Sequence, residues 1–301
     1  MCDSIPFAAP YRKRDMIGVD EAGALWYSVR VQQLDNIPAR GACTVLVCSC
    51  DKYADLLRPF ITLFRKFWPD CPFEVVLVTE TAPEELPFDR VVALGPGGTW
   101  CSRLAAALGQ VATPHVLMLC DDYYLESPVD TALVLRRLGT ARAENALNLR
   151  LIPNPKHGLP RGDGLMEYPK TTAYCIATQA GLWDRAFLKG LAERTASIWE
   201  FERYGSFSVG GETRPILATV VREFPFVDAV HKGHWEKFGV AVCRANGIEI
   251  DFAKRGLPPW TVRVKEACKA LVFAVFPHTW IVRVQNFFHA GMTEKRAADT
   301  K

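Results

Sequence analysis

The 301-residue sequence lacks the two glycine-rich loops with which many α/β proteins bind phosphates. No G-x-G-x-x-G follows the first expected strand, and G-x-x-x-x-G-K-[ST] does not occur anywhere in the chain. If the protein binds a nucleotide, a metal ion and side chains must therefore hold the phosphates, because no glycine loop is present to do so.

Strong net charge and long apolar runs are also missing. A net charge of +3 gives no argument for nucleic-acid binding. No apolar stretch reaches the ~20 residues that a helix needs to cross a bilayer. Residues 1–23 contain Pro6, Pro10 and the charged run YRKRD, so they do not read as a signal peptide. These absences predict a cytoplasmic protein without a nucleic-acid partner.

The ten cysteines form no C-x-x-C pair and no zinc-binding pattern. Several of them lie within apolar runs, where buried thiols are common: Cys43, Cys48, Cys120 and Cys175. We expect reduced, structural cysteines, which agrees with a reducing cytosol.

Strands and helices alternate in the first half of the sequence. Strands are expected at 44–50, 73–80, 90–95 and 114–122, and helices at 53–68, 102–111 and 130–138. Ser127 and Pro128 are expected to cap the last of these helices. Strand–helix–strand units in series predict an α/β fold with a doubly wound, mostly parallel sheet flanked by helices.

The second half is less regular. We expect strands at 145–153 and 219–230, a strand running into a helix over 171–193, and a helix over 236–247 that stops at Asn246-Gly247. The chain divides into an N-terminal arm over 1–42 with a strand at LWYSVRV, a domain over 43–255, and a basic, aromatic helical segment over 256–301 with a disordered end.

The segment VLMLCDDYYL, residues 116–125, ends an apolar strand in two adjacent carboxylates. Asp121 and Asp122 repel each other, which water, a cation or a ligand at the strand end would offset. In open α/β sheets that end is where ligands bind. The pair is either a solvated turn or a site for a divalent metal ion or sugar hydroxyls.

An ordered set of segments resembles the family-two-like GT-A glycosyltransferases that build bacterial polysaccharides and glycolipids. The resemblance spans residues 43–252 and rests on VCSCDKYADLL, FRKFWPD, VTE, GTWCSRLAAAL, VLMLCDDYYL, YCIATQAGLW, WEFERYGS and HKGHW. It implies a GT-A sheet, a nucleotide-sugar donor, a divalent cation (Mn²⁺ or Mg²⁺) and a hydroxyl of a glycan or glycolipid as acceptor.

By this resemblance Asp122 is the metal ligand, and Asp121 contacts ribose or sugar hydroxyls or shares the metal ion. The usual family pattern is Asp-x-Asp, but Tyr123 stands at the third position, which puts the need for a metal in question. His231 and His234 are candidates for a further metal ligand. Lys232, which lies between these histidines, could pair with the diphosphate, and the alternative for all three residues is a solvated basic loop.

The resemblance also suggests donor-binding residues after the first and third strands. Asp51 could accept hydrogen bonds from the base or ribose and Tyr53 could stack on the base, or the two could be a capping and a packing residue. Trp100 and Ser102 open the helix after the third strand. Arg103 beside them could reach the phosphate or sugar, or lie on the surface.

An inverting transfer needs a carboxylate that takes a proton from the acceptor hydroxyl. Glu200 and Glu202 are candidates because flanking aromatic residues would raise the pKa of a glutamate. The resemblance puts Glu202 first and Glu200 second, since the family commonly has an acidic residue at the head of a helix here. The alternative is a helix start with outward glutamates. Acceptor-binding candidates are Gln179, Trp183 and Trp199, of which Gln179 and Trp183 could equally be a cap and a core residue.

The tail combines large apolar residues with the cations Arg263, Lys265, Lys269 and Arg283. It is either a helical pair packed on the domain or an interfacial anchor on the inner face of a membrane. Two other functions stay open: a nucleotidyltransferase that makes a nucleotide sugar, and a non-catalytic nucleotide-sugar-binding module at the membrane. The glycine-free loop CDKYADLL argues against the nucleotidyltransferase.

Overall fold

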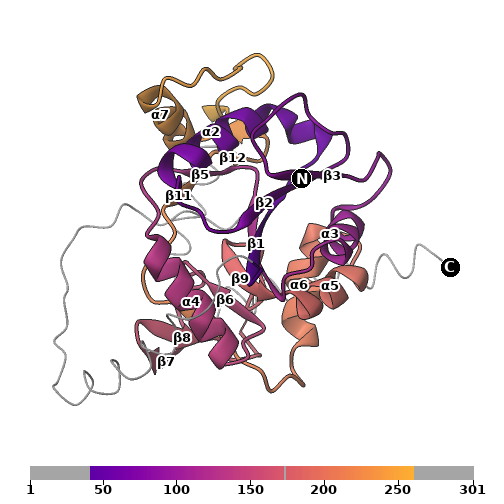
Figure 1. The fold of residues 1–301 in the computed structure, drawn as a ribbon, viewed down its shortest axis with the longest axis vertical. Helices are drawn as coiled ribbons and strands as arrows, with labels where there is room; N and C mark the ends of the chain where they lie inside the picture. Colours follow the sequence, from indigo (N-terminus) through magenta and orange to yellow (C-terminus); the bar gives the residue numbers. More distant parts are fainter. Residues whose placement is uncertain (1–40, 173, 261–301) are drawn as a thin grey trace.

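The computed structural model describes residues 41–172 and 174–260. The strand expected at LWYSVRV and the tail from residue 261 onward lie outside these ranges. The described residues form a central sheet with helices on both faces (Figure 1).

Thirteen strands and seven helices are described, one of the helices being a short 3-10 helix, η1. The strands are β1 (Cys43–Cys48), β2 (Glu74–Thr79), β3 (Arg90–Ala93), β4 (His115–Cys120), β5 (Tyr123–Leu125), β6 (Asn148–Arg150), β7 (Leu159–Gly162), β8 (Leu165–Glu167), β9 (Gly181–Asp184), β10 (Ile216–Thr219), β11 (Phe226–Asp228), β12 (Val230–His231) and β13 (His234–Trp235). The helices are η1 (Asp51–Leu56), α2 (Leu57–Phe67), α3 (Trp100–Gly109), α4 (Thr131–Ala143), α5 (Arg185–Glu193), α6 (Ile198–Ser208) and α7 (Lys237–Ala245).

The large sheet has the strand order β3-β2-β1-β4-β9-β6-β10-β8-β7. β3, β2, β1 and β4 run parallel, with Cys48 of β1 directly opposite Cys120 of β4. β9 then enters antiparallel between β4 and β6, while β10 is parallel to β6. The predicted α/β fold with a mostly parallel sheet flanked by helices is confirmed, and the antiparallel β9 is the feature that the sequence pattern did not reveal.

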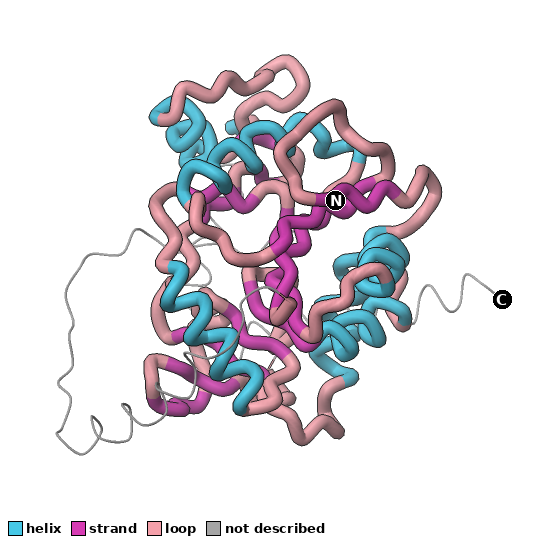
Figure 2. The backbone as a smooth tube through the Cα atoms, viewed as in Figure 1, coloured by secondary structure: helices cyan, strands magenta, loops and turns pink. Residues whose placement is uncertain are grey.

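Alternate residues of the central strands face two separate hydrophobic cores. Val45 and Val47 of β1 pack in one core with α2, α4 and α7, whereas Leu46 and Cys48 pack in the other with α3, α5 and α6. Both faces are therefore buried, which explains why the strand sequences are continuously apolar. The tube in Figure 2 shows the helices on the two sides of the strands.

Two local expectations need correction. The helix after β5 begins at Thr131, and its cap is Asp130, whose carboxylate accepts a hydrogen bond from the Leu133 amide at 2.9 Å, rather than Ser127. In the stretch 171–193 only Gly181–Asp184 forms a strand. The apolar residues before it lie in a loop that packs into the core, because burial alone does not distinguish a strand from a loop.

The predicted stop of the last domain helix is confirmed. Gly247 has φ +66°, and the amides of Gly247 and Ile248 donate to the carbonyls of Arg244 and Cys243 at 3.2 and 2.9 Å. Glycine reaches this left-handed conformation without a Cβ clash. Within the described ranges, no helix is both long and apolar enough to cross a membrane.

Candidate active site

The carboxyl ends of β1 and β4 bring Ser49 and Asp121 together. The Asp121 amide extends the ladder to the Cys48 carbonyl at 3.3 Å, and the Ser49 hydroxyl donates to Oδ2 of Asp121 at 2.5 Å. Asp121 is 8% exposed. Burial raises its pKa to about 7, although the hydrogen bond from Ser49 and the charge of Arg255 oppose this rise. Asp121 is thus a buried carboxylate at the expected edge of the sheet.

Asp122 faces a further carboxylate that the sequence did not suggest. β11 pairs with β5 so that Asp228 lies opposite Tyr123, and the Ala229 amide donates to the Asp122 carbonyl at 2.7 Å. Burial, and then the negative charges of Asp228 and Asp121, raise the pKa of Asp122 well above its ordinary value. Burial also raises the pKa of Asp228 to about 6. Three acidic side chains therefore interact electrostatically at this edge.

A divalent cation at these carboxylates would need several oxygen ligands. Within residues 41–172 and 174–260, no group of three or more His, Cys, Asp or Glu side chains is arranged to hold a metal ion. No described side chain donates a hydrogen bond to the Asp122 carboxylate or forms an ion pair with it. The Asp122 carboxylate could thus offer oxygen ligands to a hard cation only if water or phosphate oxygens supplied the others, and the metal site stays a prediction.

His231 and His234 lie opposite each other in the β12–β13 hairpin. The turn between them is Lys232-Gly233, with φ values of +51° and +81°. This hairpin follows directly after Ala229, which bonds to the Asp122 carbonyl. The Nδ1 atom of His234 is buried and has no hydrogen-bond partner in the described chain. The proposed metal and diphosphate roles of this hairpin stay predictions.

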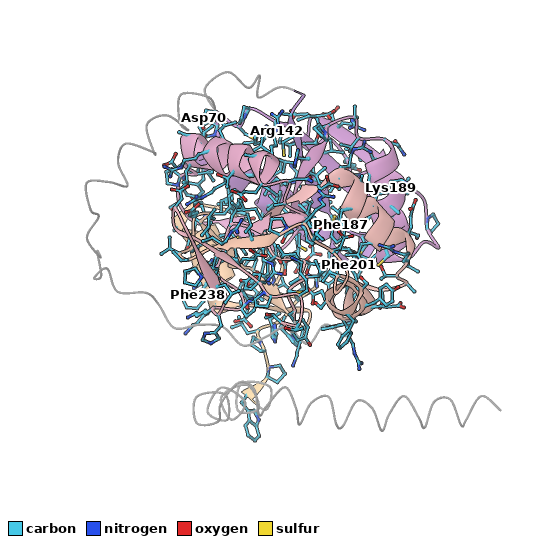
Figure 3. The ribbon with its side chains drawn as sticks, turned by 90° about the horizontal axis from the view of Figure 1, so that it is seen from below. Asp70, Arg142, Phe187, Lys189, Phe201 and Phe238 are labelled. Carbon is cyan, nitrogen blue, oxygen red and sulfur yellow. The ribbon has the colours of Figure 1, made fainter. Side chains whose placement is uncertain are left out.

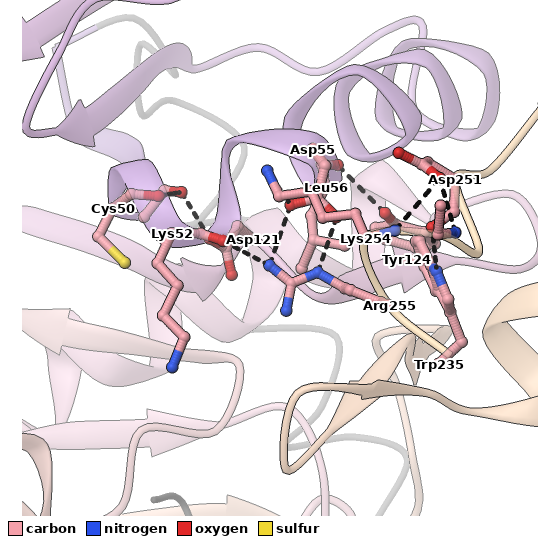
Figure 4. Close-up of polar contacts among 12 residues, drawn as sticks. Cys50, Lys52, Asp55, Leu56, Asp121, Tyr124, Trp235, Asp251, Lys254 and Arg255 are labelled. Atoms are coloured by element: carbon pink, nitrogen blue, oxygen red, sulfur yellow. Dashed lines mark hydrogen bonds and ion pairs between the residues drawn. The ribbon is translucent and has the colours of Figure 1, made fainter. Parts of the chain in front are cut away.

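Figure 4 shows how η1 and the segment after α7 meet beside Asp121. The Arg255 guanidinium donates to both carboxylate oxygens of Asp55, from Nε at 2.7 Å and from Nη2 at 2.9 Å. It also lies 4.3 Å from the centroid of the Tyr53 ring. The side chain of Tyr53, expected to stack on a base, thus has one face against a buried cation.

The other predicted donor residues form a network at the ends of β2 and α3. The Asp51 carboxylate accepts from the amide and the hydroxyl of Thr81 at 2.9 and 2.8 Å, and the Asp51 amide donates to Glu80 at 2.9 Å. Glu80 also forms an ion pair with Arg103 at 2.8 Å. Arg103 is 7% exposed, so it is not a surface arginine. Glu80, which the motifs did not single out, links these two predicted residues.

Trp100 and Ser102 occupy the first turn of α3. The Thr99 hydroxyl caps this helix by accepting from the Ser102 amide at 3.1 Å, and the Ser102 hydroxyl donates to the Thr99 carbonyl at 3.0 Å. The half-buried Trp100 ring packs edge-on against Phe201, with 5.4 Å between the centroids. Ser102 therefore stabilises the start of the helix, while Trp100 joins α3 to α6.

Glu202 is connected to the carboxylate pair through two residues, Thr178 and Tyr123. Its Oε1 accepts from both the amide and the hydroxyl of Thr178 at 2.8 Å. The Thr178 carbonyl in turn accepts from the hydroxyl of Tyr123 at 3.3 Å, and Tyr123 directly follows Asp122. Within the described chain, no hydrogen bond reaches Oε2 of Glu202. Burial raises the pKa of Glu202, against the hydrogen bonds from Thr178 and the charge of Arg150.

The backbone of α6 approaches α5 closely because residue 205 is glycine. A Cβ at Gly205 would lie 2.8 Å from Cγ2 of Ile176 and 3.1 Å from Cδ2 of Leu191, distances that a larger residue could not keep. This close packing presses the Glu202 turn of α6 against the loop that carries Thr178. Figure 3 shows Phe187 of α5 and Phe201 of α6 near each other in this region.

Glu200 and Glu202 occupy different environments although they are two residues apart. Glu200 is exposed; its amide donates to the Ser197 hydroxyl at 3.2 Å, and its carboxylate accepts from the Ala196 amide at 2.8 Å. This reciprocal arrangement resembles a capping box at the start of α6. The alternative of a helix start with outward glutamates therefore describes Glu200, while Glu202 is directed toward the core.

The three acceptor candidates are also separated. Trp183 lies in β9 with 0% exposure and stacks on Phe187 at 6.4 Å, so its environment is that of a core residue rather than an acceptor contact. Gln179 follows Thr178 and is half-buried, and Trp199 is half-buried in the first turn of α6. Gln179 and Trp199 thus stay candidates beside Glu202.

Arg150 is a fully buried cation near Glu202 that the sequence did not reveal. It donates to the carbonyls of Asn154, Tyr174 and Cys175, and its guanidinium lies 4.8 Å from the centroid of the Tyr168 ring. Burial lowers its pKa. An arginine at the end of a short strand gives no sequence signal for this role, because its partners are backbone atoms of distant loops.

No protein-family model matches this chain, and no curated protein matches it. Among solved structures, S. aureus TarS 1–349 is similar at 16% identity and a TM-score of 0.40, covering 62% of this chain and 59% of that one. The same fragment with UDP has 15% identity and a TM-score of 0.42, and with UDP-GlcNAc 14% and 0.37, each over 62% of this chain. This chain thus spans less than two thirds of the length of those structures.

Proposed function

We propose that the protein transfers a sugar from a nucleotide-sugar donor to a hydroxyl group of a polysaccharide or glycolipid, with inversion at the anomeric carbon. The observation that carries this proposal is the separation of two kinds of carboxylate. Asp121 and Asp122 form a pair at the strand ends, whereas Glu202 has one oxygen fixed by Thr178 and the other unbonded within the described chain.

Glu202 has the properties of a general base. Thr178 fixes Oε1 with two hydrogen bonds, which orients Oε2 for the acceptor hydroxyl. Its raised pKa brings proton affinity closer to the working range. In the proposed step the acceptor oxygen forms a bond to the anomeric carbon, Glu202 takes the proton of that hydroxyl, and the bond from the anomeric carbon to the diphosphate oxygen breaks.

The carboxylate pair has a different role. Asp122, with Asp121 and Asp228 close by, would hold a Mn²⁺ or Mg²⁺ ion, which would neutralise the negative charge that develops on the leaving diphosphate. Asp121, which accepts a hydrogen bond from Ser49, would accept hydrogen bonds from ribose or sugar hydroxyls. Metal use and the identity of the nucleotide are parts of this proposal.

A thermal-shift screen of nucleotide sugars, each with and without Mn²⁺, tests the proposal. A donor raises the unfolding temperature by mass action, by several degrees at concentrations far above its dissociation constant. Release of the nucleoside diphosphate from that donor, measured with a glycan acceptor, then distinguishes an enzyme from a binding module. No stabilisation by any nucleotide sugar would contradict the proposal, and binding without turnover would favour the non-catalytic module.

A further inference from the structure

Arg255 is a buried arginine with one nitrogen that has no partner in the described chain. The residue is 5% exposed. Nε and Nη2 donate to Asp55, and Nη2 also donates to the Lys52 carbonyl at 2.6 Å (Figure 4). These contacts use three of the five guanidinium N–H groups, which leaves the two on Nη1. Nη1 is not one of the fully buried side-chain nitrogen and oxygen atoms that lack a hydrogen-bond partner, so part of it is accessible to solvent.

The position of this guanidinium is built by several contacts. Asp55 binds Lys254 at 3.1 Å in addition to Arg255. Although burial opposes ionisation of Asp55, these two cations hold its pKa below the ordinary value. The chain around Arg255 is anchored by Trp235, whose amide donates to the Gly256 carbonyl at 3.1 Å and whose Nε1 donates to the Asp251 carbonyl at 3.3 Å.

The charge of Arg255 acts on the carboxylate pair without touching it. The partner of Arg255, Asp55, belongs to η1, the helix that follows Ser49, and Ser49 donates to Asp121. None of the described ion pairs joins Arg255 to Asp121 or Asp122, since its carboxylate partner is Asp55. Figure 4 shows Asp121 beside the Arg255 guanidinium, so an anion bound by this arginine would lie next to the carboxylate pair.

We propose that Arg255 binds the diphosphate of the donor through Nη1, with Asp55 as the residue that positions it. This inference rests on the proposed function. Guanidinium groups bind phosphate oxygens with strong, directional hydrogen bonds, and a carboxylate that holds the other edge fixes the direction. The arrangement also accounts for the missing glycine loop, because a preoriented arginine from the end of the domain supplies donors to the phosphates.

Arg65 provides a matched control. Like Arg255, it pairs with a carboxylate, that of Asp89 at 2.7 Å, donates to a carbonyl, that of Pro87, and lies over an aromatic ring, that of Phe64 at 6.0 Å. Its side chain is 32% exposed, and its contacts are to the loop before β3. Arg65→Met therefore removes a guanidinium with similar contacts, at a position away from the carboxylate pair.

The test measures binding of inorganic pyrophosphate in the presence of Mn²⁺ by isothermal titration calorimetry on the full chain. We expect Arg255→Met to weaken binding about tenfold or more, which is the loss of one charge-assisted contact. We expect Arg65→Met to leave binding unchanged. Arg255→Lys should bind at least about threefold more weakly, because one ammonium group cannot keep the two bonds to Asp55 and also reach the phosphate.

A second measurement separates phosphate binding from a purely structural role. The nucleoside diphosphate that binds most tightly is compared with its nucleoside, and Arg255→Met should weaken the diphosphate more than the nucleoside. Equal losses for both ligands, or unchanged pyrophosphate affinity in a folded Arg255→Met or Arg255→Lys variant, would overturn the inference. If the unaltered protein binds neither pyrophosphate nor any nucleoside diphosphate, the proposed function itself fails.

Discussion

Residues 43–125 and residues 145–235 contribute to one site by different means. In the first region, parallel strands of repeated strand–helix units end at the same edge, so Ser49 and Asp121 meet because Cys48 lies opposite Cys120. In the second region, an antiparallel strand interrupts the pattern, and Glu202 is placed by the loop residue Thr178. The regular parallel sheet thus positions the carboxylate pair, whereas two hydrogen bonds from the loop residue Thr178 position the candidate base.

The largest effect is expected in the second region, at Glu202. Glu202→Gln should reduce the rate of transfer by about 10²–10⁴-fold, because the amide cannot accept the proton, while donor affinity stays near that of the unaltered protein. Steady-state rates and donor titrations measure the two quantities. Glu200→Gln is the matched control, since Glu200 caps α6 from the exposed side, and it should change the rate by no more than about twofold. Equal rate losses in both variants would remove the distinction between the two glutamates.

In the first region, Asp122→Ala should act on donor binding as well as on rate. We expect donor affinity measured with Mn²⁺ to fall by about tenfold or more, because the variant loses the carboxylate proposed to hold the cation. Titration of the donor with and without Mn²⁺ measures this loss. Asp70→Ala, an exposed carboxylate in the turn after α2, serves as the control. Undiminished, Mn²⁺-dependent binding in Asp122→Ala would show that this residue does not hold the metal ion.

Arg150 tests whether the second region depends on individual bonds for its stability. Arg150→Met removes donors to three backbone carbonyls, each bond contributing about 1 kcal/mol, while it also removes the cost of burying a charge. We expect a net loss of about 1–3 kcal/mol in the free energy of unfolding, measured by urea denaturation. A variant as stable as the unaltered protein would show that the two terms cancel.

The pH dependence of the transfer rate should report on Glu202. A base must be ionised, and burial raises the pKa of this carboxyl, so the rate should fall as pH decreases through a value above that of an ordinary glutamate. Arg150 and the two hydrogen bonds from Thr178 act in the opposite direction. In Thr178→Val, which removes the hydroxyl bond but keeps the amide bond, the acid limb should move to higher pH. If the acid limb of the pH–rate profile does not move in Thr178→Val, the titration that it reports belongs to another group.

The smallest effect concerns the segment beyond the domain. Contact with a membrane surface stays a prediction that rests on the basic and aromatic sequence after residue 260. The full chain should sediment with anionic phosphatidylserine-containing vesicles more than a chain that ends at residue 256, and salt should weaken this binding. Equal sedimentation of the two chains would favour the helical pair packed on the domain.

Much of the fold follows from local sequence patterns. The apolar runs, the helical spacing and the Asn246-Gly247 stop predicted the parallel strands and most helices, since each depends on neighbouring residues. The strand β9 was only partly predicted, because its direction depends on which strands it pairs with. Trp183 shows the same limit, since an aromatic residue in a strand can face either the core or a ligand until its neighbours are known.

The sequence by itself determined that two carboxylates follow an apolar strand, that no glycine loop is present, and that Glu200 and Glu202 lie between aromatic residues. Only the tertiary structure decided which glutamate is directed inward, and that Asp228 and Arg255 approach the pair. Arg255 and Asp55 are separated by 200 residues, and Asp122 and Asp228 by more than a hundred. Contacts at such separations depend on how the chain packs as a whole, because no local pattern of residues encodes the distance between them.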